Sequence, residues 1–304
     1  MTASTSIRKI DTHQHVFWQN RDDVGLIADM DEHGIEYAWL LSWEIAPSEH
    51  NQNYVRVLNP TRVRPDGTHG GIPLDDLVIA KRNYPDRFVL GFCPHPLAGD
   101  APARLRAAAG IYNVNVCGEW KFRIPFDDPR CIQLFRTAGE LGMPIVLHLD
   151  VPFLPDENGH PAYYSNWYGG TVENLERALI ACPETVFIGH APGFWREISA
   201  DAASSRDVYP EGPVQAPGQV HRLLETYDNL YADLSAGSGR MALERDPEHA
   251  KKFLVDFSTK LFFARDYYGG ELDTFLASIE LDNETRENLF WRNAEKFVAA
   301  PTSK

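Results

Sequence analysis

Short apolar runs rich in β-branched and aromatic residues recur along the whole chain, and amphipathic segments of helical length lie between most of them. This alternation is typical of repeated β–α units around a parallel sheet. About eight runs qualify as strands, which is the number that closes a barrel of β–α units. We therefore predict an α/β fold, a single (β/α)8 TIM barrel over residues 1–304. The predicted strands are Ile7–Asp11, Tyr37–Leu41, Phe88–Phe92, Val114–Trp120, Pro144–Leu149, Thr185–Gly189, Asn229–Leu234 and Lys260–Ala264.

Several helix ends are marked by residues that start or stop helices. Asp128-Pro129 and Asp246-Pro247 each place an acidic N-cap before a proline at the first helical position. Gly110 and Gly142 are expected to end the helices that precede them. The predicted helices are Leu74–Asn83, Ala101–Ala109, Pro129–Leu141, Thr171–Ala181, Gln219–Tyr227 and Pro247–Phe257, with an extra C-terminal helix, Asn283–Ala299, whose Leu289, Phe290, Ala294 and Phe297 are expected to pack on the outside of the barrel.

The charge of the chain limits its partners. With 29 Lys and Arg against 43 Asp and Glu, the formal net charge is −14, which argues against nucleic acid or an anionic membrane as a partner. The segment Met1–Ile7 lacks the pattern of a secretory signal, and the four widely spaced cysteines show no disulfide framework. We therefore expect a cytoplasmic protein with a small-molecule substrate, and a homo-oligomer stays open.

Histidines and a carboxylate stand where predicted strands end. His13 and His15 are two residues apart on the first strand, so both side chains point to one face. His148 and His190 end the fifth and sixth strands, and Asp266 follows the eighth. A histidine on an apolar strand is often only structural, but a closed barrel brings these strand ends around one mouth. Imidazole and carboxylate ligands suit divalent transition metals, so we predict a shared metal site.

With these motifs the sequence resembles the amidohydrolase superfamily, in the amidohydrolase-related branch of metal-dependent TIM-barrel hydrolases and non-oxidative decarboxylases. The resemblance spans nearly the whole chain. It implies that Asp266 is both a metal ligand and a proton carrier, and that His190 is either a ligand or a polarising catalytic residue. The motifs that carry it are Asp11-Thr-His-Gln-His15, His148, Ile-Gly-His190-Ala, Asp266 and Asn293-Ala-Glu-Lys-Phe297, and the further implied metal ligands are His13, His15 and His148.

Two features depart from the family pattern. Ala264-Arg265 stands where the family usually has glycine followed by serine or threonine, so a bulky cation lies beside Asp266. Glu119 and Lys121 share a face of the fourth strand. Either Glu119 is a metal ligand and Lys121 meets an anionic substrate, or the two residues form a buried ion pair.

The resemblance and the predicted site together favour a metal-dependent hydrolase that activates water for attack on a C–N or C–O bond. Asp266 would move the proton, and His190 or Lys121 would polarise the substrate oxygen. The expected ion is Zn²⁺, with Mn²⁺ as the alternative. A metal-dependent decarboxylase of a small aromatic or unsaturated carboxylic acid is the second reading, and an inactive barrel that serves as a binding protein is the third.

Two long loops, 150–170 and 191–218, leave the strand ends where a barrel builds its site. Their aromatic and cationic residues would suit a ring or a carboxylate-bearing ligand, although the same residues could equally anchor the loops or form an oligomer interface. They are Tyr163, Tyr164, Trp167, Tyr168, Phe194, Trp195 and Arg196, joined by Arg62 and Arg64 from the second loop.

Overall fold

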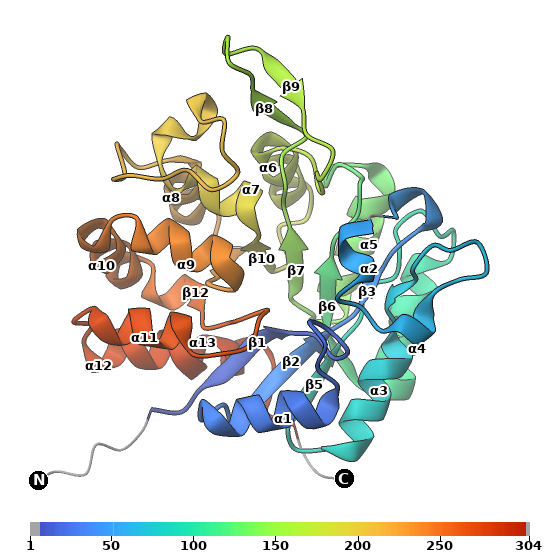
Figure 1. Ribbon diagram of the computed structural model, residues 1–304. Helices are drawn as coiled ribbons and strands as arrows, with labels where there is room; N and C mark the ends of the chain where they lie inside the picture. Colours follow the sequence, from blue (N-terminus) through green and yellow to red (C-terminus); the bar gives the residue numbers. More distant parts are fainter. Residues whose placement is uncertain (1–6, 51, 302–304) are drawn as a thin grey trace, which may run out of the picture.

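The computed structural model describes residues 7–50 and 52–301. Eight parallel strands form one sheet in the order β1-β2-β5-β6-β7-β10-β11-β12 (Figure 1). Thr12 N donates to Phe263 O at 3.2 Å and Asp266 N donates to His13 O at 2.8 Å, so β1 meets the segment that follows β12. The predicted barrel is confirmed. Its strands are β1 Ile10–Gln14, β2 Tyr37–Leu41, β5 Phe88–Gly91, β6 Val114–Trp120, β7 Ile145–His148, β10 Phe187–His190, β11 Leu230–Asp233 and β12 Leu261–Phe262.

The strand predictions differ most at the start of the chain. β2 and β6 have the predicted bounds, whereas β1 begins three residues later than predicted, at Ile10 rather than Ile7. All five residues of β1 are buried although four of them are polar. Apolar periodicity cannot detect such a strand, because the partners that make its polar residues buriable lie elsewhere in the barrel.

Helices surround the strands (Figure 1). The capping predictions are confirmed: Asp128 accepts a hydrogen bond from Arg130 N, and Asp246 accepts one from His249 N. The helices that connect successive strands, with the one that follows β12, are α1 Asp23–Glu32, α3 Leu74–Asn83, α4 Ala101–Tyr112, α5 Pro129–Glu140, α6 Val172–Ala181, α8 Gln219–Thr226, α10 Pro247–Asp256 and α11 Glu271–Ser278.

Gly110 does not end a helix as predicted. It lies inside α4, which continues to Tyr112 and ends at Asn113 in the left-handed conformation, with φ of 54°. Asparagine tolerates this conformation better than most residues, so it replaces glycine as the helix stop. Gly142 does follow α5 with φ of +69°, as predicted.

The C-terminal helix differs from its prediction in shape and place. It consists of α12 Asn283–Glu287, a π-helical turn Asn288–Arg292, and α13 Asn293–Phe297. Leu289 and Phe290 pack in the layer between strands and helices. Ala294, expected on the outside, instead joins the barrel interior with Tyr37 and Tyr231 near the strand starts. The last helix therefore covers the barrel end opposite the histidines.

Short elements decorate the rim. The hairpin of β8 Phe153–Pro155 and β9 Pro161–Tyr163 projects at the top of Figure 1. The other rim elements are β3 Trp43–Glu44, α2 Gln52–Val55, β4 Gly71–Ile72, α7 Pro192–Trp195 and α9 Ala236–Glu244, with 3-10 turns at Pro47–Glu49, Pro60–Arg62, Arg196–Ile198 and Ala200–Ser204. A further 3-10 turn, Ser258–Lys260, directly precedes β12 at the opposite end of the barrel.

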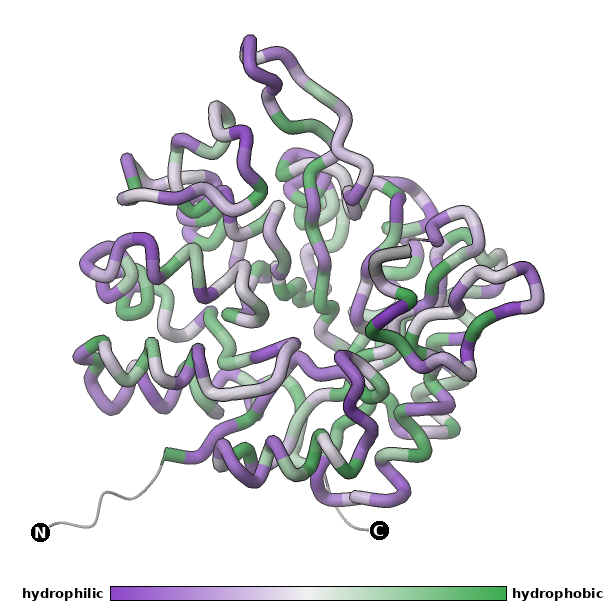
Figure 2. The backbone as a smooth tube through the Cα atoms, viewed as in Figure 1, coloured by the Kyte–Doolittle hydropathy of each residue, from purple (hydrophilic) through white to green (hydrophobic). Residues whose placement is uncertain are grey.

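The apolar residues gather toward the centre of the molecule, where Figure 2 shows the strands mostly green and the outer helices mixed. All four cysteines are buried and free. Among the described residues, no helix is both long enough and apolar enough to span a membrane. Residues 1–6, which carry most of the segment in which no secretory signal was found, lie outside the described residues.

Candidate metal centre

Side chains from four distant segments converge at the C-terminal ends of the strands. His13 comes from β1 and His15 directly follows it, Glu119 comes from β6, His190 from β10 and Asp266 from the segment after β12. His15 Nε2 lies 3.5 Å from Asp266 Oδ1 and 3.4 Å from Glu119 Oε2. His13 Nε2 lies 3.9 Å from Asp266 Oδ1, and His190 Nε2 lies 3.8 Å from Glu119 Oε1. Two overlapping sets could hold a metal ion, because the ligand atoms of each set lie within 4.8 Å of one another: His13, His15 and Asp266, and His13, Glu119 and His190.

The Nδ1 atom of each of these histidines is hydrogen bonded on the side of the ring away from the cluster. His15 Nδ1 donates to Leu41 O at 2.7 Å. Nδ1 of His13 and Nδ1 of His190 lie 2.9 and 3.0 Å from the two oxygens of Asp233. Although burial opposes its ionisation, the adjacent His190 and His13 hold the pKa of Asp233 well below its usual value. The sequence analysis missed Asp233, whose one signal is a carboxylate at the end of an apolar strand.

Two polar atoms of this cluster have no hydrogen-bond partner within the described chain. They are His13 Nε2 and Asp266 Oδ1, and both are buried. An unsatisfied buried polar atom costs about 1–3 kcal/mol, so such atoms call for a ligand. Imidazole nitrogen and carboxylate oxygen are donors that divalent transition metals accept. The residues present therefore fit a metal ion.

His148, also predicted as a ligand, is differently engaged. Its Nδ1 lies 2.6 Å from Glu119 Oε1, and its Nε2 lies 3.0 Å from Asp150 Oδ2. It pairs in register with His190 across β7 and β10. His148 thus lies beside the cluster, but both of its ring nitrogens are hydrogen bonded to carboxylates and it belongs to neither ligand set.

The pairing of Lys121 with Glu119 is loose. Lys121 Nζ lies 4.0 Å from Glu119 Oε1, whereas Glu119 makes closer contacts with His148 and His15. The ammonium group faces aromatic rings, at 4.5 Å from the Trp43 centroid and 5.0 Å from that of Tyr54. Burial acts to lower the pKa of Lys121, but Glu119 together with the other acidic groups around it raises the pKa, so the charge persists. Glu119 is therefore part of the convergent cluster and not merely half of an ion pair.

Asp266 has an unusual backbone conformation. Its φ is 57°, in the left-handed region that residues other than glycine rarely adopt. Its N–H donates to His13 O at 2.8 Å, and its carbonyl accepts from Trp18 Nε1 at 2.9 Å. Such strain, fixed from both sides, is typical of functional residues.

The departure at Arg265 has a structural explanation. Its side chain turns outward, with Nε donating to Asp11 Oδ2 at 2.7 Å and Nη1 lying 2.8 Å from Asp29 Oδ2. The guanidinium pairs with one carboxylate of β1 and one of α1, and its Nη1 also donates to Gly269 O at 3.0 Å. Arg265 therefore stabilises the barrel and adds no cation to the metal cluster.

Most of the loop residues expected to wall a pocket have structural roles instead. Tyr168 does reach the site, with its ring centroid 5.3 Å from that of His148, whereas Tyr163 is 64% exposed on the hairpin. Trp195 is buried and donates to Asp233 O at 2.9 Å. Tyr164 and Trp167 are half-buried in the same loop as Tyr168. The remaining residues are Phe194 in the core, Arg196 bonded to the carbonyl groups of Ala202 and Ser205, Arg62 paired with Asp76, and Arg64 bonded to the carbonyl groups of Ile45 and His69.

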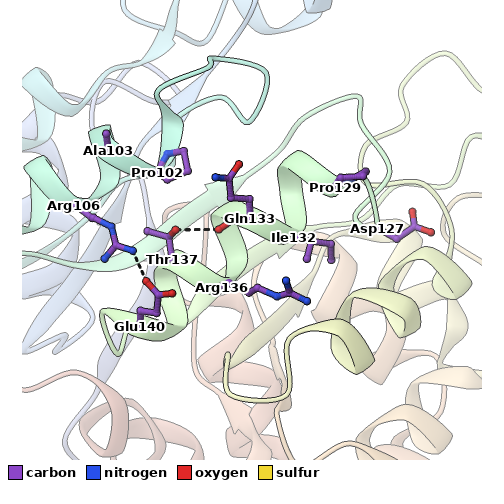
Figure 3. Close-up of a pocket in the computed structure, with 10 residues that line it drawn as sticks. All are labelled: Pro102, Ala103, Arg106, Asp127, Pro129, Ile132, Gln133, Arg136, Thr137 and Glu140. Atoms are coloured by element: carbon purple, nitrogen blue, oxygen red, sulfur yellow. Dashed lines mark hydrogen bonds and ion pairs between the residues drawn. The ribbon is translucent and has the colours of Figure 1, made fainter.

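A hollow of about 750 Å³ lies away from this centre, between α4 and α5 (Figure 3). Its polar groups bond to one another or to neighbouring residues: Arg106 pairs with Glu140, Thr137 donates to Gln133 O, and Asp127 accepts from Asn174. Among the described residues, the buried polar atoms without a hydrogen-bond partner include none from the lining of this hollow.

No family model matches the chain, and no curated protein matches it. Solved structures do match over nearly the full length. An uncharacterised TIM-barrel protein from Bordetella bronchiseptica has 16% identity and a TM-score of 0.62, covering 97% of this chain and 99% of its own. A dihydroxybenzoic acid decarboxylase from Polaromonas with bound manganese has 15% identity and a TM-score of 0.57, covering 96% of each chain.

A candidate 2-pyrone-4,6-dicarboxylic acid hydrolase from Pseudomonas putida is similar at 13% identity and a TM-score of 0.57, covering 96% of this chain and 97% of its own. These structures include both reaction types that the sequence resemblance allows. At such low identity the likeness establishes the fold. The protein has the TIM-barrel fold of the amidohydrolase-related enzymes, the family that its histidine and aspartate motifs resemble.

Proposed function

We propose that this protein is a divalent-metal-dependent hydrolase of a small substrate with a C–N or C–O bond. The observation that carries the proposal is the convergence of two unpartnered buried atoms, His13 Nε2 and Asp266 Oδ1, on His15 Nε2. Burying these polar atoms without partners costs free energy, and a bound ligand would offset that cost. An inactive binding barrel would have no physical reason to keep this set of atoms.

His13, His15 and Asp266 would hold the ion, with Glu119 and His190 facing the same point. His148, the further ligand that the resemblance implies, would have to exchange its contact with Asp150 for the ion. We propose Zn²⁺, with Mn²⁺ as the alternative that the manganese of the Polaromonas structure supports. When bound, a divalent ion lowers the pKa of water to about 7 and polarises a substrate oxygen.

Each remaining polar group of the mouth has a distinct task. Asp266 would accept a proton from the attacking water and return it to the leaving group. Lys121 lies beside the cluster, and no hydrogen bond of its ammonium group is found among the described residues. It is therefore available to donate to a substrate oxygen or carboxylate. One such donor contributes about 10²–10³ in rate.

Decarboxylation is the second candidate, and the observation that favours it is the likeness to dihydroxybenzoate decarboxylases. In that reaction no water attacks. Lys121 would hold the substrate carboxylate, and Asp266 would donate a proton to the ring carbon as carbon dioxide leaves. Both reactions need the same metal cluster and the same proton carrier, so the cluster alone does not choose between them.

Elemental analysis of the purified protein, followed by chelation and restoration with Zn²⁺ or Mn²⁺, tests the metal. We expect a stoichiometric ion and a lower melting temperature after chelation; no ion and an unchanged melting temperature would contradict the proposal. The reaction is then assigned by incubating the loaded protein with 2,6-dihydroxybenzoate and with cyclic esters and amides in H₂¹⁸O. Incorporation of ¹⁸O indicates hydrolysis, and release of carbon dioxide without it indicates decarboxylation.

A further inference from the structure

One buried carboxylate joins two histidines of the cluster. Asp233 ends β11 and is 0% exposed. Its Oδ2 lies 2.9 Å from His13 Nδ1, and its Oδ1 lies 3.0 Å from His190 Nδ1. The two imidazole rings are 4.4 Å apart between centroids although they come from β1 and β10. Asp233 is thus the shared contact that sets how both rings face the site.

The two oxygens of Asp233 have different surroundings. Oδ1 also accepts from Ser235 N at 3.1 Å and from Ser235 Oγ at 2.6 Å. Ser235 Oγ in turn lies 2.7 Å from His190 Nδ1. Hydrogen bonds to Oδ2 from described residues come from His13 alone. The atom at the Oδ1 position must therefore be a hydrogen-bond acceptor, because Ser235 donates to it whether or not His13 is present.

An ionised carboxylate can only accept hydrogen bonds, so a ring nitrogen that bonds to it must carry a proton. With Nδ1 protonated, a neutral imidazole has its lone pair on Nε2. We propose that Asp233 is a positioning residue that fixes His13 and His190 together in the Nδ1–H tautomer, so that both Nε2 lone pairs face the centre between Glu119 and Asp266. Its effect on metal affinity rests on the function proposed above, whereas its effect on the tautomers does not.

The asymmetry of the two oxygens gives a residue-specific expectation for Asp233→Asn. The amide has one acceptor and one donor end. Because Ser235 N must donate to position Oδ1, the amide oxygen takes that position and the NH₂ group faces His13. His13 Nδ1 then becomes an acceptor and its proton moves to Nε2, while His190 keeps its tautomer. One substitution should therefore change one of two adjacent histidines.

The test is ¹⁵N NMR of the histidine rings in the metal-free protein, at a pH above their titration, with signals assigned by His13→Gln and His190→Gln. In the wild type we expect Nδ1–H for both residues. In Asp233→Asn we expect Nε2–H for His13 only, with zinc affinity about 10–100-fold weaker by chelator competition. Asp150→Asn is the matched control, since Asp150 is equally buried but contacts His148 Nε2; it should leave both tautomers unchanged.

An Nε2–H signal from His13 or His190 in the wild type would overturn the inference, and this measurement requires no variant to fold beyond those used for assignment. An unchanged His13 signal with wild-type zinc affinity in Asp233→Asn would also overturn it. Failure of the wild type to bind zinc or manganese would instead contradict the proposed function, and the tautomers would still be decided by the metal-free spectra.

Discussion

Arg265 and Asp11 form a buried ion pair directly behind the candidate metal site, with Nε and Oδ2 2.7 Å apart and both side chains at most 4% exposed. Asp11 precedes the His13 motif by two residues, and Arg265 immediately precedes Asp266. The pair thus joins the two segments that supply the proposed ligands, at the point where the barrel closes.

Arg265→Met should be strongly destabilising, because it leaves the Asp11 carboxylate buried without its cation and leaves Asp29 with only its more exposed partners. Removing one member of a buried pair costs about 3–5 kcal/mol. Arg21→Met is the control, since Arg21 also contacts Asp29 but its side chain is 41% exposed, so the expected loss is at most about 1 kcal/mol. Urea unfolding measures the free energy of unfolding of both variants. Equal losses in the two variants would show that the buried ion pair contributes no more to stability than the exposed one.

Asp266→Asn should keep the fold and lose turnover by about 10²–10⁴-fold, since an amide cannot carry the proton. Its backbone contacts to His13 and Trp18 do not involve the side chain. Circular dichroism would confirm the fold, and single-turnover kinetics with the substrate found in the assays above would measure the step. Near-normal turnover would remove Asp266 from the mechanism.

Lys121→Met keeps the length of the side chain and removes its charge, so we expect turnover or substrate affinity to fall about 10²-fold. Lys296→Met is a matched control, because Lys296 also lies over aromatic rings, those of Tyr231 and Phe297, but at the closed end of the barrel. Comparable kcat/KM values for the two variants would contradict the assignment of Lys121 to the substrate.

Glu119→Gln tests whether Glu119 is a metal ligand or a structural partner of its neighbours. If the carboxylate faces the ion, metal content should fall because a neutral amide is a weaker ligand, and this is the result we expect. The readout is the metal-to-protein ratio after dialysis, compared with the melting temperature of the metal-free variant. A normal ratio with a lowered melting temperature would make Glu119 a structural partner of His148.

His221 on α8 and His249 on α10 have their Nε2 atoms 3.0 Å apart. We expect this pair to lower the free energy of unfolding in mild acid. Burial and the neighbouring His249 lower the pKa of His221 to about 4. The unfolded chain, with a histidine pKa of about 6.5, binds this proton first, so stability is lost as the pH falls from about 6.5 toward 4.

The expected contribution is about 2 kcal/mol between pH 7.5 and 5. Urea unfolding of the wild type and of His221→Gln at these two pH values measures it. The variant should lose about 2 kcal/mol less than the wild type over this interval. Identical pH dependence in both proteins would show that His221 is not buried in its neutral form.

The fold could be predicted because most β–α units are marked by local sequence patterns, namely an apolar run for the strand and start or stop residues for the helix. β2, β6 and α3 have the predicted bounds, and the proline-marked starts of α5 and α10 are confirmed. The predictions failed where distant partners decide the structure. β1 is polar and becomes a buried strand only because Asp11 meets Arg265 and His13 meets Asp233.

The candidate site was predictable in its residues but not in their pairings. The strand ends named His13, His15, His190 and Asp266, which do converge. The hydrogen bond of His148 to Asp150 and the role of Asp233 depend on which strands are neighbours and on their register. The spacing of residues along the sequence predicts neither strand order nor register. The same holds for Arg265, whose outward turn depends on Asp29 of α1.

The contact between Asp266 N and His13 O has a consequence for how the molecule is assembled during translation. A chain that has grown only as far as α10 already contains the paired histidines but lacks the strand that brings Asp266 to them. A chain seven strands long therefore holds His13, His15, Glu119 and His190 but lacks Asp266, the proposed proton carrier, so we expect a ribosome-bound fragment of this length to be catalytically inactive.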